Sequence, residues 1–270
     1  MARLLYGHVM ARGVRINYYR TGGEKPPVIL IHGLAEYGLG WSRFPLFIEP
    51  SYDVVMIDLR GHGMSEKPET GYSIEAMSED LFWVVKTLNL IKPVILGHSL
   101  GANVAIEFTR QNPGLVSGII LEDPPWRMEE ISETERISAF KSNQAWLQDL
   151  KNKSLEELIV ICKQRNPTWT DNENMQWAKG KQLASLQIYQ YFLQPAWDWQ
   201  RLVSSIRVPG LLVTSETNLG GIVTPEVSEI VSKLWKKCKV EYLPGAGHFI
   251  HREQYFKFRD VTKLFLRQML

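Results

Sequence analysis

The residues best suited to carry chemistry are Gly97-His98-Ser99-Leu100-Gly101, a Gly-x-Ser-x-Gly pentapeptide. A Val/Ile/Leu run precedes it and apolar residues at helical spacing follow it, so the chain turns sharply from strand to helix with Ser99 at the apex. Such a turn strains the Ser99 backbone and lifts its hydroxyl clear of the sheet. It needs Gly97 and Gly101 because strand and helix pass too closely for a Cβ. An ordinary glycine-flanked loop is the alternative, but the context predicts that Ser99 is a nucleophile.

A serine hydroxyl is a weak nucleophile at neutral pH, so it needs a histidine as general base and an acid to orient that histidine. His248 follows the last predicted strand in the glycine-rich loop Pro244-Gly245-Ala246-Gly247, which places it at the same sheet edge as Ser99. We predict that His248 is the base and that His251 is a solvated surface group. Structural roles are expected for the remaining histidines, His8, His32, His62 and His98.

Backbone amides near Ser99 could hold the oxyanion that forms when a carbonyl group is attacked. The amide of Leu100 is the first of the new helix, where amides lack helical partners. His32-Gly33-Leu34-Ala35 ends another buried strand, and the amide of Leu34 or Ala35 could be the second donor. A plain turn capped by His32 is the alternative interpretation of that segment.

The alternation of strand-like and helical segments predicts a mostly parallel central sheet flanked by helices, an α/β fold. Residues 6–18, with a turn at Arg12-Gly13, are typical of an antiparallel hairpin at a sheet edge. Further strands are predicted at residues 27–31, 53–58, 93–96, 117–122, 208–214 and 239–243. Helices are predicted at residues 73–90 and 224–236, and a closing helix is predicted to reach Leu270. Ligands bind such a sheet at the carboxyl ends of its strands.

The strand pattern disappears between the sixth and seventh predicted strands, where helical segments replace it. They include a capping box at Ser154 and a segment at residues 173–193. Six of the nine tryptophans fall in this third of the chain: Trp126, Trp146, Trp169, Trp177, Trp197 and Trp199. We predict a core domain of residues 1–123 and 200–270, with residues 124–199 forming a helical cap over the active site. Trp126 is predicted to contact substrate; tryptophans that only pack the cap helices together are the alternative.

The composition is typical of a globular protein, since 44% of the 270 residues are hydrophobic and 22% are charged. A net charge of +2, with scattered basic residues, gives no reason to expect nucleic acid or an anionic membrane as a partner. The chain start lacks the apolar core of a signal peptide, so a cytoplasmic location is expected. Cys162 and Cys238 are expected to be buried thiols, and no metal or cofactor is expected. The oligomeric state is left open.

Four motifs in order give the chain a resemblance to the α/β-hydrolase family over nearly its whole length. They are His32-Gly33, Asp58-x-x-Gly61-His62-Gly63, the Ser99 pentapeptide, and Gly247-His248. The resemblance implies a serine nucleophile, a histidine base, two backbone amides as the oxyanion hole and a helical cap over the pocket. The residues that match these roles are Ser99, His248, Leu34 and Leu100.

The acid of the triad departs from the family pattern. Members commonly carry Gly-Glu-x-Asp after the strand that follows the cap, whereas this chain has Ser215-Glu216-Thr217-Asn218, and a neutral asparagine cannot stabilise an imidazolium as a carboxylate does. Some branches place the acid one strand earlier, at the position of Asp123. We therefore predict Asp123 as the acid, with Glu216 as the alternative. A loop-capping role before Pro124-Pro125 is the other possibility for Asp123.

A serine at position 99 excludes the dehalogenase and epoxide-hydrolase branches of the family, which need an aspartate there. The predicted activity is hydrolysis of a small carboxylic ester or lactone, acyl-homoserine lactones included. The aromatic cap favours an apolar acyl or aryl group on the substrate. Carbon–carbon bond hydrolysis, perhydrolysis, and a binding-only, receptor-like role are the alternatives, the last of which Asn218 favours.

Overall fold

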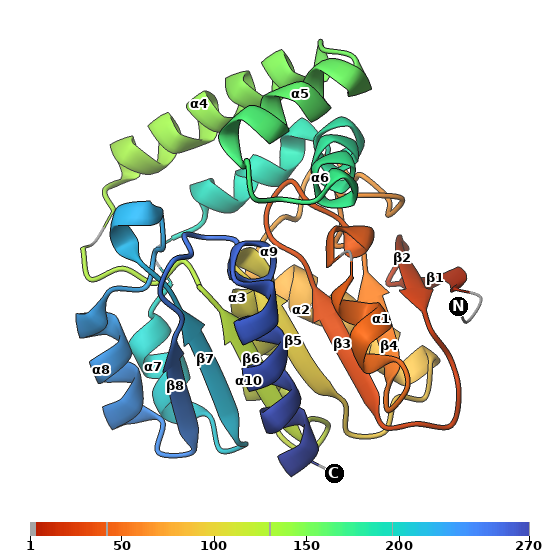
Figure 1. Cartoon of the computed structure of the whole chain (residues 1–270), viewed down its shortest axis with the longest axis vertical. Coiled ribbons are helices and arrows are strands. Elements are labelled where there is room, and N and C mark those ends of the chain that lie inside the picture. Colours follow the sequence, from red (N-terminus) through yellow and green to blue (C-terminus); the bar gives the residue numbers. More distant parts are fainter. Residues whose placement is uncertain (1–3, 42, 130, 196, 270) are drawn as a thin grey trace.

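The computed structural model describes residues 4–41, 43–129, 131–195 and 197–269, so Met1 and Leu270, the outer limits of the predicted core domain, lie outside the described residues. One eight-stranded sheet runs through the molecule in the order β1-β2-β4-β3-β5-β6-β7-β8 (Figure 1). The strands are β1 (Leu5–Ala11), β2 (Val14–Arg20), β3 (Pro27–Ile31), β4 (Asp53–Ile57), β5 (Val94–His98), β6 (Gly118–Glu122), β7 (Gly210–Thr214) and β8 (Cys238–Tyr242). From β4 to β8 all pairings are parallel, which confirms the predicted fold class.

The first two strands form the predicted antiparallel hairpin, and β1 is an edge strand of the sheet. Arg12 and Gly13 both have positive φ angles, of 45° and 89°. Two such residues in a row form the tight turn whose twist matches the flanking strands. The hairpin joins the parallel strands through antiparallel pairing of β2 with β4.

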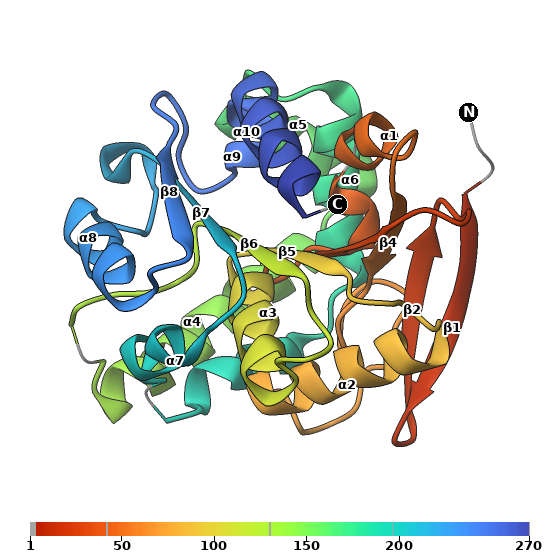
Figure 2. The ribbon, with the colours of Figure 1, turned by 90° about the horizontal axis from the view of Figure 1, so that it is seen from below.

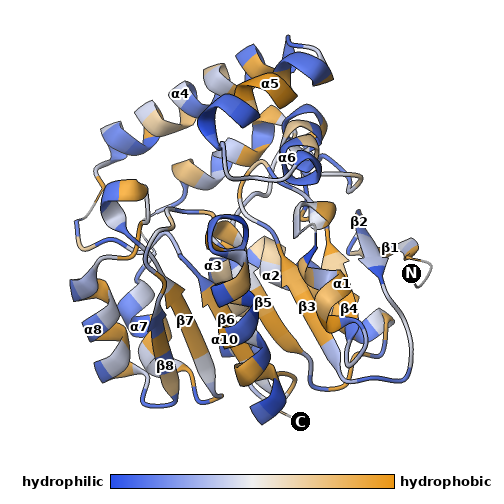
Figure 3. Ribbon diagram, in the orientation of Figure 1, coloured by the Kyte–Doolittle hydropathy of each residue, from blue (hydrophilic) through white to orange (hydrophobic). Residues whose placement is uncertain are grey.

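The central strands are buried on both faces because helices cover both (Figure 2). Alternate residues of each strand therefore enter two separate cores: Ile29 and Ile31 lie on one face of β3, and Val28 and Leu30 on the other. One face carries α2 (Ile74–Thr87), α3 (Leu100–Gln111), α7 (Trp199–Ser205) and α8 (Pro225–Leu234). The other carries α1 (Phe44–Ile48), α9 (Ile250–Glu253) and α10 (Tyr255–Gln268). Figure 3 shows the central strands β3, β5, β6 and β7 as mainly hydrophobic.

The predicted helix starts are confirmed by their caps. The side chains of Ser73, Ser154 and Thr224 each accept a hydrogen bond from an amide in the first turn of the helix that follows. The helix ends differ by two or three residues from the prediction, with α2 ending at Thr87 and α8 at Leu234.

Between β6 and β7 the chain is largely helical, and its helices from residue 133 to residue 193 lie over the carboxyl ends of the strands (Figure 1). They are α4 (Glu133–Lys151), α5 (Leu155–Arg165), α6 (Asp171–Leu183) and the 3-10 helix η2 (Leu186–Leu193). The single segment predicted at residues 173–193 is thus split, because the backbone becomes extended at Ala184. Trp169 and Trp177 pack with Leu158 and Cys162 in a small core of this region, which favours a packing role for part of the tryptophan cluster.

Candidate active site

Ser99 lies between β5 and α3 with φ 52° and ψ −116°, so the predicted backbone strain is confirmed. The flanking glycines are required by space. A Cβ on Gly97 would lie 2.2 Å from the Gly101 carbonyl oxygen, and one on Gly101 would lie 2.3 Å from the carbonyl oxygen of Ile31. Ser99 is 9% exposed, and its hydroxyl has no hydrogen-bond partner among the described residues.

Asp123 occupies the matching position on the neighbouring strand, directly after β6, and also has a positive φ of 41°. Its carboxylate is fully buried and accepts three hydrogen bonds from the backbone, two from the Ile222 amide and one from Val223, all at 3.0 Å. The Nδ1–H of His248 donates to Asp123 Oδ2 at 2.6 Å. Since Nδ1 carries the proton in this contact, the Nε2 of a neutral His248 is left as a proton acceptor.

The imidazole of His248 also lies beside the serine turn. His98, the residue before Ser99, donates from Nε2 to the carbonyl oxygen of His248 at 2.9 Å, and the centroids of the two rings are 4.6 Å apart. Ser99 itself is tied to the strand of the acid, because its amide donates to the Glu122 carbonyl at 2.9 Å. The structure thus brings the predicted nucleophile, base and acid to one edge of the sheet.

The alternative acid, Glu216, makes a different contact. Its Oε1 accepts a hydrogen bond from the amide of Gly245 at 2.7 Å, in the loop that leads to His248. Asn218 lies in a short 3-10 helix, η3 (Thr217–Leu219), in the loop after β7. The backbone amides that bind the Asp123 carboxylate are those of Ile222 and Val223, in the loop after β7, and not amides of the loop at Pro124-Pro125 that Asp123 was considered to cap.

Two amides were predicted as oxyanion donors, that of Leu100 and that of either Leu34 or Ala35. The structure distinguishes between Leu34 and Ala35. Leu100 is the first residue of α3, so its amide has no partner within the helix. The amide of Ala35 donates to His62 Nε2 at 3.1 Å and is not free for a substrate. Leu34 is partly buried, and its amide remains the predicted donor of that loop.

The structural role predicted for His62 is confirmed, and Asp58 orders the neighbouring loops together with it. Asp58 accepts hydrogen bonds from the amides of Gly38 and Met64 at 2.7 and 2.8 Å. His62 donates from Nδ1 to the Arg60 carbonyl, which leaves Nε2 to accept the bond from Ala35. Burial lowers the pKa of the His62 imidazole well below its usual value, in keeping with a neutral ring that accepts a backbone hydrogen bond.

The prediction that His251 is a solvated surface group is wrong. His251 is 3% exposed, and both its backbone amide and Nδ1–H donate to Glu122 Oε1, at 2.8 and 2.9 Å. Helix α9 turns inward after His248 and places this ring against Trp41, with centroids 4.7 Å apart. Burial lowers the pKa of His251 to about 3 and raises that of Glu122 to about 7.

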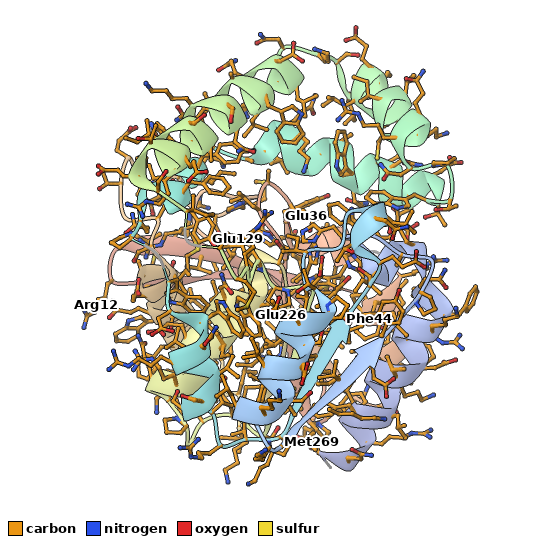
Figure 4. All side chains as sticks on the ribbon, turned by 90° about the vertical axis from the view of Figure 1, so that its left-hand side faces the viewer. Arg12, Glu36, Phe44, Glu129, Glu226 and Met269 are labelled. Atoms are coloured by element: carbon orange, nitrogen blue, oxygen red, sulfur yellow. The ribbon has the colours of Figure 1, made fainter. Side chains whose placement is uncertain are left out.

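A group of buried charges next to His98 was not predicted. Arg252 pairs with Glu36 and lies over the rings of Trp169 and Phe249. Burial alone would raise the pKa of Glu36, but Arg252 and His98 hold it well below its usual value. Glu36 lies beneath the helices of residues 133–193 (Figure 4). In the sequence, the only indication that Glu36 lies near the site was its position directly after the His32-Gly33-Leu34-Ala35 segment.

Trp126 is placed differently from the prediction that it contacts substrate. It is 1% exposed, its Nε1–H donates to Asn103 Oδ1 at 2.8 Å, and its ring stacks on Trp199 with centroids 5.3 Å apart. Almost none of the indole surface is open, so any influence on substrate passes through these neighbours.

The predictions about thiols, metals and membranes can be compared with the described residues. Cys162 is buried, Cys238 is partly exposed, and both are free thiols. Within the described ranges, no group of three or more metal-ligating side chains is found. No helix in the described part of the chain is long and apolar enough to cross a bilayer.

Comparison with known proteins gives the fold a family. A sequence model of the alpha/beta hydrolase fold matches residues 26–255. N-formylmaleamate deformylase of Pseudomonas putida is 26% identical over 254 residues, which cover 90% of each chain.

Solved structures agree with the family match. E-2-(acetamidomethylene)succinate hydrolase superposes with a TM-score of 0.82 at 19% identity, covering 98% of this chain and all of the other. Est816, described as an N-acyl homoserine lactone degrading enzyme, superposes with a TM-score of 0.73 at 23% identity, covering 96% of this chain and all of the other. At these identities the superpositions show a shared fold.

Proposed function

The chain belongs to the alpha/beta hydrolase fold family, and from that premise we propose that it is a serine hydrolase of small carboxylic esters or lactones. Ser99 is the nucleophile, His248 the general base and Asp123 the acid that orients it. The amides of Leu34 and Leu100 form the oxyanion hole. The observation that carries the proposal is the 2.6 Å hydrogen bond from His248 to Asp123 beside the strained turn of Ser99.

In the proposed reaction, Ser99 Oγ attacks the substrate carbonyl carbon while its proton moves to His248 Nε2. The carbonyl oxygen becomes an oxyanion held by the two amides. When this intermediate collapses, the bond to the leaving alcohol breaks and His248 gives its proton to the alcohol oxygen. Water, activated by the same imidazole, then hydrolyses the acyl-enzyme and regenerates Ser99. A lactone follows the same steps, except that the leaving oxygen stays attached to the acyl chain.

Asp123 is suited to its proposed role by its surroundings. The backbone amides of Ile222 and Val223 fix the carboxylate in place, so Oδ2 stays directed at His248. A fixed carboxylate orients the imidazole and stabilises the imidazolium that forms after proton transfer. This contact weighs against the binding-only alternative, which was based on the neutral Asn218.

The family relative favours a second candidate, hydrolysis of a small amide. N-formylmaleamate deformylase, by its name, removes a formyl group, and its sequence aligns over 90% of this chain. The same residues could carry out C–N cleavage, with His248 protonating the leaving nitrogen in place of an oxygen.

A substrate panel tests the proposal and separates the two candidates. It contains p-nitrophenyl esters of increasing acyl length, acyl-homoserine lactones and N-formyl amides, each assayed with wild-type protein and Ser99→Ala. We expect turnover of esters or lactones that is lost in Ser99→Ala. Turnover confined to the amides would favour the second candidate, and no turnover of any substrate would favour a binding-only protein.

A further inference from the structure

Lys181 is a buried cation that the proposed chemistry does not use. It lies on α6 and is 3% exposed, and its Nζ donates to the carbonyl oxygen of Ala35 at 2.9 Å. The rings of Trp177 and Trp146 lie 5.1 and 5.6 Å from the same nitrogen. Burial lowers the Lys181 pKa to about 8, although Glu36 opposes the shift. Burying an ammonium group costs free energy. We therefore ask what its contact with Ala35 does.

The partner of Lys181 is a strained residue of the oxyanion loop, which we define as residues 32–36. Ala35 has a φ of 56°, which is unfavourable for a residue with a side chain. His62 binds its amide from the loop after β4, and Lys181 binds its carbonyl from α6. Ala35 is therefore held from both sides. Because Leu34 immediately precedes Ala35, the direction of the Leu34 amide depends on these two hydrogen bonds.

The backbone of α6 also comes close to the oxyanion loop. A Cβ on Gly180 would lie 3.2 Å from the Ala35 carbonyl oxygen and 3.2 Å from Glu36 Cα. Contacts of 3.2 Å are tighter than most Cβ contacts in proteins and would require a shift of a few tenths of an ångström, so glycine at this position lets the helix approach closely. Lys181 and Gly180 thus form adjoining parts of one contact between α6 and the oxyanion loop.

We propose that Lys181 is a positioning residue that holds the oxyanion loop from the helical segment above it, through its hydrogen bond to the carbonyl oxygen of Ala35. The inference rests on the proposed serine-hydrolase function. Lys181 is 146 positions from Ala35 in the chain. In this proposal it stabilises the transition state by positioning the oxyanion loop. A residue acting in this way lowers kcat when removed and leaves substrate binding nearly unchanged.

The test is Lys181→Met, which keeps a long apolar side chain and removes the donor. We expect kcat to fall about 10- to 100-fold, less than or similar to the loss of an oxyanion donor itself, with KM changed by less than about 3-fold. Inhibition by a trifluoromethyl ketone, whose adduct with Ser99 carries an oxyanion, should weaken by the same factor as kcat. A merely structural lysine would not produce this parallel.

Lys151→Met is the matched control. Lys151, on α4, donates to the carbonyl oxygens of Gln182 and Ala184, so it binds the end of α6 without reaching the oxyanion loop. Its loss should lower thermal stability and leave kcat within about 2-fold of wild type. Equal losses of kcat in the two variants would overturn the proposal, because both would then act through the stability of the helical segment.

Gly180→Ala tests the same contact if Lys181→Met does not fold. Alanine stabilises a helix more than glycine does, so the variant should remain folded. Its Cβ would push α6 away from the oxyanion loop, so kcat should fall several-fold. Unchanged kcat in Gly180→Ala, or in a folded Lys181→Met, would overturn the proposal. Ser99→Ala, measured alongside, separates the two failures: if it is inactive, unchanged kcat in the Lys181 variant counts against the positioning role alone.

Discussion

Replacing Asp123 by asparagine is the substitution that discriminates best among the site residues. Oδ1 of Asp123 accepts from the amides of Ile222 and Val223, while Oδ2 faces His248 Nδ1 at 2.6 Å. An asparagine oxygen at the Oδ1 position keeps one bond from each of the two amides and loses only the additional contact from the Ile222 amide to Oδ2, so the loop stays in place. Its NH2 group then faces His248 Nδ1, which must become an acceptor. The ring proton moves to Nε2, and that nitrogen can no longer take the proton of Ser99.

The size of this effect follows from the loss of the required tautomer. The comparable change in a serine-protease triad lowers kcat about 10⁴-fold, which corresponds to roughly 5.5 kcal/mol of transition-state stabilisation. We expect a similar loss for Asp123→Asn on the best ester of the panel, with circular dichroism and thermal unfolding close to wild type. Steady-state kinetics at several pH values measure it.

Glu216→Gln is the control for the alternative acid. The carboxylate of Glu216 binds only the Gly245 amide among the described residues, so this variant should retain kcat within a few-fold of wild type. An Asp123→Asn protein within tenfold of wild-type kcat, or a Glu216→Gln protein with the larger loss, would refute the choice of Asp123.

Three further predictions concern packing and pH. Gly101→Ala should lower the free energy of unfolding by about 3 kcal/mol or more, because its Cβ would lie 2.3 Å from a backbone oxygen. Urea unfolding measures this loss, with Gly114→Ala as the control because no atom lies within 4 Å of a Cβ there. Equal stabilities of the two variants would contradict the prediction. Trp126→Ala should lower turnover of acetate and longer esters by similar factors because the indole is covered; selective loss on long acyl chains would instead support direct substrate contact. Stability should fall as the pH drops below about 6.5, since burial keeps His32 and His62 neutral in the folded protein while the unfolded chain takes up protons, up to about 1.4 kcal/mol per pH unit for each ring. Urea unfolding from pH 7 to 5 measures how steeply the free energy of unfolding depends on pH. This dependence should be weaker in His62→Gln than in the wild type, and an equally steep dependence would refute the contribution of His62.

The sequence was informative wherever a backbone conformation demanded particular residues. The strand before Ser99, the flanking glycines and the helix after it leave one arrangement, because any Cβ at Gly97 or Gly101 meets backbone atoms. Asp123 was predicted in another way, from the resemblance to family branches that place the acid one strand earlier. Carboxyl ends of parallel strands meet at one edge of a sheet, and the structure pairs the strand of Asp123 with that of Ser99.

Side-chain placement in the helical segments could not be predicted in the same way. His251 is three residues after His248, and only the inward turn of α9 decides that it faces Glu122 instead of solvent. Trp126 was expected at the pocket, but its stacking on Trp199 depends on a contact between residues 73 positions apart. Lys181 meets Ala35 over a still longer separation, and no local pattern marks either contact.

The most direct test of the central claim is the site of covalent labelling by a fluorophosphonate. The intact protein is incubated with the reagent, digested, and the modified residue is identified by mass spectrometry, with Ser99→Ala and Asp123→Asn treated in parallel. We predict one equivalent of label on Ser99 in the wild type, none in Ser99→Ala, and much slower labelling in Asp123→Asn. A wild-type protein that stays unlabelled, or a Ser99→Ala protein with undiminished ester hydrolysis, would contradict the serine-hydrolase account.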